Sequence, residues 1–237
     1  MKFTGFIFVL PLLYADVIVF TAKKQSYLQD WFINENTIVL KNQTLIQCAA
    51  ECGALDGCMS ISYKRTTQDC LGVNNGYLVQ PLTLGYDSTG WSYYLVLDER
   101  CPEAIGYVFS KAFNSCYKVH LYNTTLVYSD YSQLCESEGG ELMKIGSQEK
   151  QKHIVNHLGQ LDISDWIFFQ GMHLLSETPW RYNDGSVISY FNWHPTQPDP
   201  TAQKPLEYLC MKQFYQYQWH DCWGTMKGAF ICEIYIK

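Results

Sequence analysis

The stretch that decides the fold is residues 190–232, YFNWHPTQPDPTAQKPLEYLCMKQFYQYQWHDCWGTMKGAFIC. Its closely spaced prolines suit neither a helix nor a strand and predict a stiff, irregular loop. Side-chain oxygens come from four of its residues, Gln197, Asp199, Glu207 and Asp221. Oxygen donors of this kind hold Ca²⁺. The residues therefore predict a loop that binds a cation and, with it, a hydroxyl-bearing ligand; a proline-bent loop without an ion is the alternative.

Length and composition indicate a globular protein. The chain has 237 residues, enough for one large domain or two small ones. With 47% hydrophobic and 17% charged residues, it differs from a disordered chain, which is poor in hydrophobic residues and rich in charge. The net charge is −6 and no basic run exceeds Lys23-Lys24 in length, so we expect no nucleic-acid partner.

The first residues are typical of a secretory signal peptide. Lys2 supplies the positive start, residues 5–14 are apolar, and Ala15 is a plausible cleavage residue, with cleavage near residues 21–22 as the alternative. A second apolar segment, 163–175, is interrupted by polar residues and predicts a buried strand. We therefore expect a secreted, extracellular protein with no membrane span after signal removal.

The ten cysteines predict a disulfide framework in two domains. In a secreted chain an even number of cysteines favours disulfides over zinc, although Cys48, Cys52 and Cys58 are closely spaced. The cysteines fall into two groups, residues 48–70 and 101–232. This grouping predicts a signal peptide at 1–15, a first domain at 16–98 and a second domain at 100–237.

The first domain is predicted to pack one helix on a small sheet. Thr44 and Gln47 form a possible capping box for a helix over residues 44–55, and strands are expected at 59–63, 77–79 and 91–97. The pattern at 45–71 resembles the PAN/apple family. That resemblance implies the disulfides Cys48–Cys70 and Cys52–Cys58, and partners among extracellular proteins or glycans.

The second domain is predicted to contain two helices. They are expected at 128–138 and after Ser147. His153 and His157 are four residues apart on the second helix, where they could meet a metal. No third ligand is evident, so we predict that they lie on a solvated helix face.

The second domain resembles the C-type lectin-like family. The motifs that match in order are Trp180-Arg181-Tyr182-Asn183-Asp184-Gly185-Ser186, Tyr190-Phe191-Asn192-Trp193, Gln197-Pro198-Asp199 and Phe230-Ile231-Cys232-Glu233. The resemblance implies an α+β fold with two helices, mixed sheets and a long loop. It also implies a cis Pro198, galactose-type sugar binding, and the disulfides Cys101–Cys116, Cys135–Cys232 and Cys210–Cys222.

Three residues depart from that family's calcium site. His220 stands where the family has asparagine, and imidazole is a poor ligand for a hard cation. Glu207 lies three residues before Cys210 instead of two, and Asp221 directly precedes Cys222. Trp219 is expected in the core. Residues 200–206 supply no aromatic face for a sugar, a role that could fall to Tyr208, Tyr215, Tyr217 or Trp223.

Two functions remain after these observations. The first is a secreted lectin that binds glycans or glycoproteins, with Ca²⁺ held by Gln197, Asp199, Glu207 and Asp221. The alternative is a calcium-independent module on a lectin-like scaffold that binds protein or matrix. No nucleophile or acid–base constellation is visible, so we predict no enzymatic activity. The sequons at Asn42 and Asn123 predict a glycoprotein.

Overall fold

The computed structural model describes residues 5–9, 19–33, 37–40, 43–55, 57–74, 76, 85–121, 126–174, 179–199 and 206–236. The chain divides into two units, residues 1–116 with Ile236, and residues 117–235. The predicted domain boundary at residues 98–100 stays a prediction. Asn42, Asn123, the strand expected at 77–79 and most of the predicted signal peptide lie outside the described residues.

The first unit contains a six-stranded antiparallel sheet. Its order is β1-β2-β8-β5-β6-β4, and the strands are β1 (Gly5–Val9), β2 (Val19–Lys24), β4 (Thr37–Val39), β5 (Ser60–Lys64), β6 (Asp69–Val73) and β8 (Trp91–Asp98). A separate pair joins β3 (Trp31–Ile33) to β7 (Gly85–Asp87), with the short helix η1 (Ser26–Leu28) before it. β1, which falls within the predicted signal peptide, pairs with β2.

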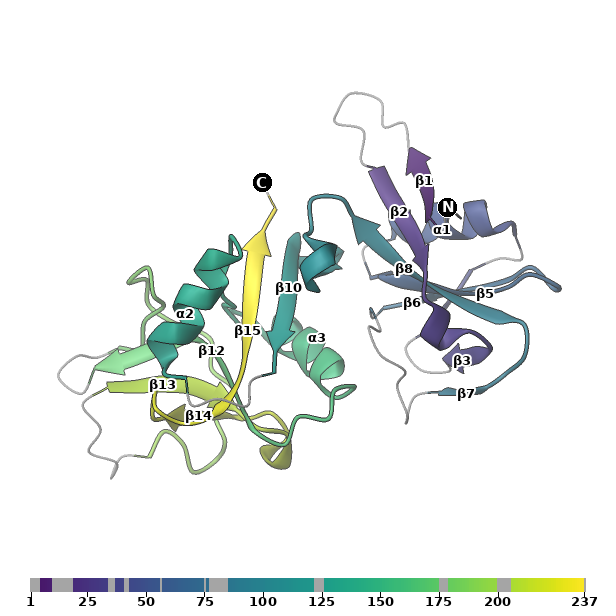
Figure 1. The fold of residues 1–237 in the computed structure, drawn as a ribbon. Helices are drawn as coiled ribbons and strands as arrows, with labels where there is room; N and C mark the ends of the chain where they lie inside the picture. Colours follow the sequence, from purple (N-terminus) through teal and green to yellow (C-terminus); the bar gives the residue numbers. More distant parts are fainter. Residues whose placement is uncertain are drawn as a thin grey trace. The chain divides into compact units, whose positions relative to one another are not determined.

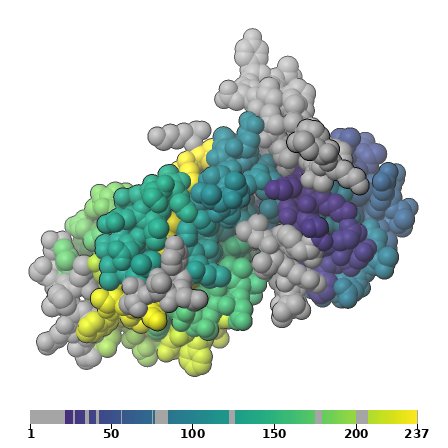
Figure 2. All heavy atoms as spheres, viewed as in Figure 1, coloured from purple at the N-terminus to yellow at the C-terminus, as the bar shows by residue number. Residues whose placement is uncertain are grey.

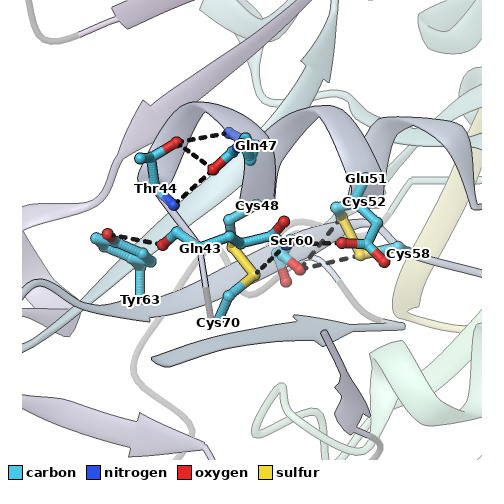
Figure 3. Close-up of a disulfide and its surroundings, with 10 residues drawn as sticks. All are labelled: Gln43, Thr44, Gln47, Cys48, Glu51, Cys52, Cys58, Ser60, Tyr63 and Cys70. Carbon is cyan, nitrogen blue, oxygen red and sulfur yellow. Dashed lines mark hydrogen bonds between the residues drawn. A yellow bond between two sulfur atoms is a disulfide. The ribbon is translucent and has the colours of Figure 1, made fainter. Parts of the chain in front are cut away.

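Helix α1 (Leu45–Ala54) is fixed to this sheet by disulfides. The predicted capping box is present, because the Thr44 side chain accepts a hydrogen bond from the Gln47 backbone and the Gln47 side chain accepts one from the Thr44 backbone. Cys48 is joined to Cys70 of β6, and Cys52 to Cys58 just before β5. Figure 3 shows the two bridges under the helix, with Thr44 at one end of it.

Five strands of the second unit and most of β10 belong to a seven-stranded sheet (Figure 1), whose strand β9 falls within residues 1–116. The order is β14-β13-β12-β15-β10-β9, with β11 paired to β15, and β12 runs parallel to β15. The strands are β9 (Val108–Ser110), β10 (Ser115–His120), β11 (Glu141–Leu142), β12 (Trp166–Leu174), β13 (Leu206–Met211), β14 (Trp219–Cys222) and β15 (Gly228–Tyr235). The division between the units passes through β10, after Cys116.

Two α-helices lie beside the strands of this unit. They are α2 (Tyr128–Ser137) and α3 (Gln148–Leu158), and the short helix η4 (Gln213–Tyr215) follows β13. The short helices η2 (Glu103–Ile105) and η3 (Lys111–Phe113) fall within residues 1–116. Tyr131 and Cys135 turn the inner face of α2 into the core, and the outer face lies at the surface in Figure 2 (teal). The Ser147 side chain caps α3 by accepting a hydrogen bond from the Lys150 backbone, as predicted.

The core of the second unit is aromatic and closed by disulfides. Tyr131 stacks on Phe230 with ring centroids 4.7 Å apart, and Phe168 and Phe169 of β12 are fully buried. Cys135 of α2 is joined to Cys232 of β15, and Cys210 of β13 to Cys222 of β14. With Cys101–Cys116, these pairs are the ones that the resemblance implies.

The prediction that His153 and His157 lie on a solvated helix face is wrong. His157 is 4% exposed, and both rings meet the buried Tyr117 of β10 edge-on, with centroids 5.1 Å away for His157 and 5.6 Å for His153. Burial lowers the pKa of both histidines to about 4. The two rings extend the buried stripe of Ile154 and Leu158, because residues three and four apart share one side of a helix.

Candidate functional site

The loop that carries Gln197-Pro198-Asp199 is held against β14 by backbone hydrogen bonds. The Trp219 amide donates to the Asn192 carbonyl at 2.8 Å, and the His194 amide donates to the Trp219 carbonyl at 3.0 Å. The Gln197 amide then donates to the His194 carbonyl at 2.8 Å, which closes a turn. The Gln197–Pro198 peptide bond is cis. Residues 192–197 therefore follow the start of β14 closely.

This arrangement brings three of the four candidate ligands to one region. The Asp199 amide donates to Oδ2 of Asp221 at 3.3 Å, so Asp199 lies against β14. The amide oxygen of Gln197 is buried and has no hydrogen-bond partner. A buried acceptor without a donor is costly and is a place where an ion or water is expected.

The fourth candidate, Glu207, lies beside His173, a residue that no sequence motif singled out. Glu207 is 5% exposed, and its Oε2 lies 3.4 Å from Nδ1 of His173. The two residues face each other across the β12–β13 ladder. His173 also stacks on Trp180, with centroids 5.1 Å apart. Alternation along residues 166–174 could have placed His173 on a face of the strand, but only strand pairing shows its partner.

His220 is part of an aromatic cluster and is separate from the candidate ligands. Its ring, 7% exposed, lies 4.4 Å from Tyr215, 5.1 Å from Trp166 and 5.1 Å from His194, measured between centroids. His220 faces Cys210 across the β13–β14 ladder, whereas Asp221 faces Leu209, and successive side chains on a strand point to opposite sides. Burial, and then His194, lowers the pKa of His220 to about 4.

Trp219 is a core residue, as predicted, and it fixes the start of β14. Its side chain is fully buried, and its indole N–H donates to the Gln151 side chain at 2.8 Å. Gln151 of α3 also donates to the Tyr217 carbonyl at 3.0 Å. One buried amide thus connects α3 to the strand that carries Asp221. Gln151 was not among the predicted site residues, since it lies in a helix far from the loop in sequence.

One of the four aromatic residues proposed as a sugar platform is well exposed. Trp223 is 58% exposed and directly follows β14. Tyr217 is buried, Tyr215 belongs to the His220 cluster, and Tyr208 stacks on Tyr128 with centroids 3.9 Å apart. Tyr208 pairs with Cys222 at one end of the β13–β14 ladder. Glu207 and Trp223 are therefore the next residues beyond that end.

The four candidate ligands carry oxygen atoms of the kind that a hard cation prefers, but the four do not lie together at ligand spacing in this structure. Among the described residues, one group of three His, Cys, Asp or Glu side chains has its ligand atoms within 4.8 Å of one another, namely His120, Glu138 and Cys232. Cys232 is in a disulfide, so that group offers no thiolate. Asp199 and Asp221 lie together, whereas Glu207 is turned toward His173.

Loss of the Cys210–Cys222 bridge is expected to weaken ligand binding before the fold is lost. The bridge joins β13, which carries Glu207, to β14, which carries Asp221. A small loop of this kind contributes about 2–4 kcal/mol, chiefly by restricting the unfolded chain. Binding and far-ultraviolet circular dichroism of a Cys210→Ser, Cys222→Ser variant check this. Normal ligand binding by the variant would contradict the expectation.

The fold of the second unit is that of a C-type lectin-like domain. Residues 124–234 match the family model described as the lectin C-type domain. The second unit therefore carries such a domain, with the mixed α and β architecture predicted from the sequence. The first unit lies outside that match, and its PAN/apple resemblance stays a prediction.

Known proteins similar to this chain include receptors. Human layilin is 26% identical over 142 residues, which are 50% of this chain and 36% of layilin. The human secretory phospholipase A2 receptor is 26% identical over 137 residues, 55% of this chain and 9% of the receptor. The solved mouse scavenger receptor C-type lectin carbohydrate-recognition domain is 27% identical and covers 52% of this chain and 92% of that domain, with a TM-score of 0.45. The chain spans about a third of layilin and about a tenth of the phospholipase receptor.

A binding role without catalysis agrees with this domain and with relatives that include a receptor. Among the described residues, the longest helix is α3 with 11 residues, and no helix is long and apolar enough to cross a membrane.

Proposed function

We propose that the protein is a secreted, carbohydrate-binding lectin that uses the Gln197-Pro198-Asp199 loop. The observation that carries the proposal is the buried amide oxygen of Gln197, which has no hydrogen-bond partner and lies two residues from the Asp199–Asp221 contact. An oxygen of this kind is matched by a hard cation such as Ca²⁺. Bound Ca²⁺ would supply a coordination site for sugar hydroxyls.

In this proposal the loop residues hold the ion and the strand residues complete its shell. Gln197 contributes a neutral oxygen, and Asp199 and Asp221 contribute carboxylates. Glu207 contributes a third carboxylate. The ion competes with His173 for this carboxylate. Such a site has an affinity of about 10⁻⁴–10⁻³ M, typical of extracellular modules. Trp223 is the exposed ring that offers a face to the apolar side of a galactose-type sugar.

Calcium titration with three variants tests the proposal. We expect saturable heat from the wild-type protein, no heat after Asp199→Ala or Asp221→Ala, and unchanged heat after Asp165→Ala. Asp165 is a matched control, because it is an exposed carboxylate in the same unit, just before β12. A glycan array with and without chelator then reports whether sugar binding depends on the ion. Equal heats from wild type and Asp199→Ala would reject the assigned ligands.

The second candidate is a calcium-independent module on the same scaffold. The proximity of Glu207 to His173 favours it, since the carboxylate lies against a neighbouring side chain instead of joining the other candidate ligands. Absence of calcium heat in wild type, together with chelator-resistant binding to a glycan, protein or matrix component, would select this candidate. In both cases we propose that the first unit is a PAN/apple-like module and that Asn42 and Asn123 carry glycans.

A further inference from the structure

The first unit contains a cavity on the face of its sheet that carries α1. The cavity measures about 560 Å³, within the range of about 300–1,000 Å³ that is usual for small-ligand sites. Its lining comes from four places in the fold, namely β2, β5 and its following turn, β8, and the start of α1. The lining residues are Lys24, Thr44, Leu45, Ile46, Tyr63, Arg65, Gln68, Ser92 and Tyr94.

Strand register explains why these side chains meet. Lys24 faces Tyr94 across the β2–β8 ladder, and Ser92 faces Tyr63 across the β8–β5 ladder. Directly paired residues lie on the same face of a sheet, and so do Ser92 and Tyr94, two residues apart. Tyr63 in turn faces Cys70, which is bonded to α1. The Tyr63 hydroxyl donates to the Gln43 carbonyl just before the helix, as Figure 3 shows.

The cavity is positively charged. Two dibasic pairs, Lys23-Lys24 and Lys64-Arg65, each contribute one cation to its lining. Lys23 instead lies 3.8 Å from Glu103, and Lys64 lies over the ring of Trp91, 5.9 Å from its centroid. No carboxylate is among the described residues that line the cavity. The amino terminus of α1 adds a partial positive charge at one wall.

We propose that this cavity binds an acidic saccharide, a sugar ring that carries a carboxylate or sulfate group. Arg65 offers a planar fork of donors that matches either oxyanion, and Lys24 offers a second cation from the opposite side of Tyr94. The buried rings of Tyr63 and Tyr94 supply faces for the apolar side of a sugar. Gln68 supplies an amide for sugar hydroxyls, and Thr44 and Ser92 add hydroxyl oxygens whose protons are donated to Gln47 and Gln29.

The test is a calorimetric titration of the full chain in the presence of chelator. Chelator keeps a calcium-dependent site in the second unit from binding, so this result is independent of the proposed function. The probes are the sulfated chondroitin disaccharide, the unsulfated chondroitin disaccharide, neutral lactose and a tetraglutamate peptide. We expect saturable binding of the two acidic disaccharides and no heat from lactose or the peptide.

Matched variants distinguish binding at this cavity from attraction of the probe by the net charge of the protein. Lys24→Gln and Arg65→Gln are expected to weaken disaccharide binding about tenfold each, the effect of losing a charge-assisted hydrogen bond. Lys23→Gln and Lys64→Gln remove the same charge from the other face of the same strands, and binding should stay within about twofold of wild type. Thermal unfolding of all four proteins verifies that each is folded.

Three results would overturn the proposal. One is the absence of heat from both acidic disaccharides with wild-type protein. Another is equal weakening by Lys23→Gln and Lys24→Gln, which would mean that overall charge attracts the probe. The third is tetraglutamate binding as tight as disaccharide binding, which would assign the cavity to acidic peptides.

Discussion

Replacing Glu233 with glutamine is expected to lower the free energy of unfolding by about 3–5 kcal/mol. Glu233 of β15 is fully buried, and both of its carboxylate oxygens lie 2.7 Å from Nζ of Lys150 on α3. The substitution keeps the shape of the side chain but removes the carboxylate charge that faces the buried ammonium group. Urea denaturation followed by circular dichroism measures the change.

A double variant is the control for this effect. Lys150→Met combined with Glu233→Leu removes both charges and keeps similar volumes, and replacing a buried ion pair by apolar residues is often neutral or stabilising. We therefore expect the double variant to be more stable than Glu233→Gln. A loss below about 1 kcal/mol in the single variant would mean that the pair is well solvated and does not hold α3 to β15.

Acidification from pH 6.5 to pH 4 is expected to destabilise the protein, with His157 as a main contributor. Its pKa is about 4 in the folded state because the ring is buried against Tyr117, and about 6.5 in the unfolded chain. Between these values the unfolded state binds more protons, so stability falls as pH falls. Above pH 6.5 this contribution is complete and flat. A difference of this size corresponds to on the order of 3 kcal/mol.

His157→Phe isolates that contribution from those of other titrating groups. Phenylalanine keeps an aromatic ring against Tyr117 but carries no proton, so the variant should lose less stability than wild type between pH 6.5 and 4. The measurement is the free energy of unfolding in urea at half-unit steps of pH. Parallel pH profiles for the two proteins would show that His157 does not titrate differently in the folded and unfolded states.

Local signals in the sequence were sufficient for the three α-helices and for the strands β5, β8 and β12. The capping box of Thr44 and Gln47 marks the start of α1, and Ser147 caps α3. The apolar segment at 163–175 predicts a buried strand, and β12 occupies Trp166–Leu174. These features depend on residues a few positions apart, which is why a linear pattern reveals them.

Contacts between residues far apart in the sequence could not be predicted from such linear patterns. The histidines of α3 were assigned to solvent because no third metal ligand is evident beside them, whereas Tyr117, about 40 residues earlier, buries them. Glu207 was grouped with Asp221 as an ion ligand, and strand pairing places His173 beside it. The acidic-saccharide cavity likewise exists because β2, β5 and β8 are adjacent in the sheet.

The sequence by itself determined the class of the second domain, the number of cysteines available for bridges and the residues that offer oxygens to an ion. These depend on residue types and their order, which are fixed before folding. Tertiary structure decided which oxygens lie together, that His220 belongs to an aromatic cluster and that Gln151 connects α3 to β14. Register and side-chain packing set those distances, since a one-residue shift in a strand turns each side chain to the opposite face.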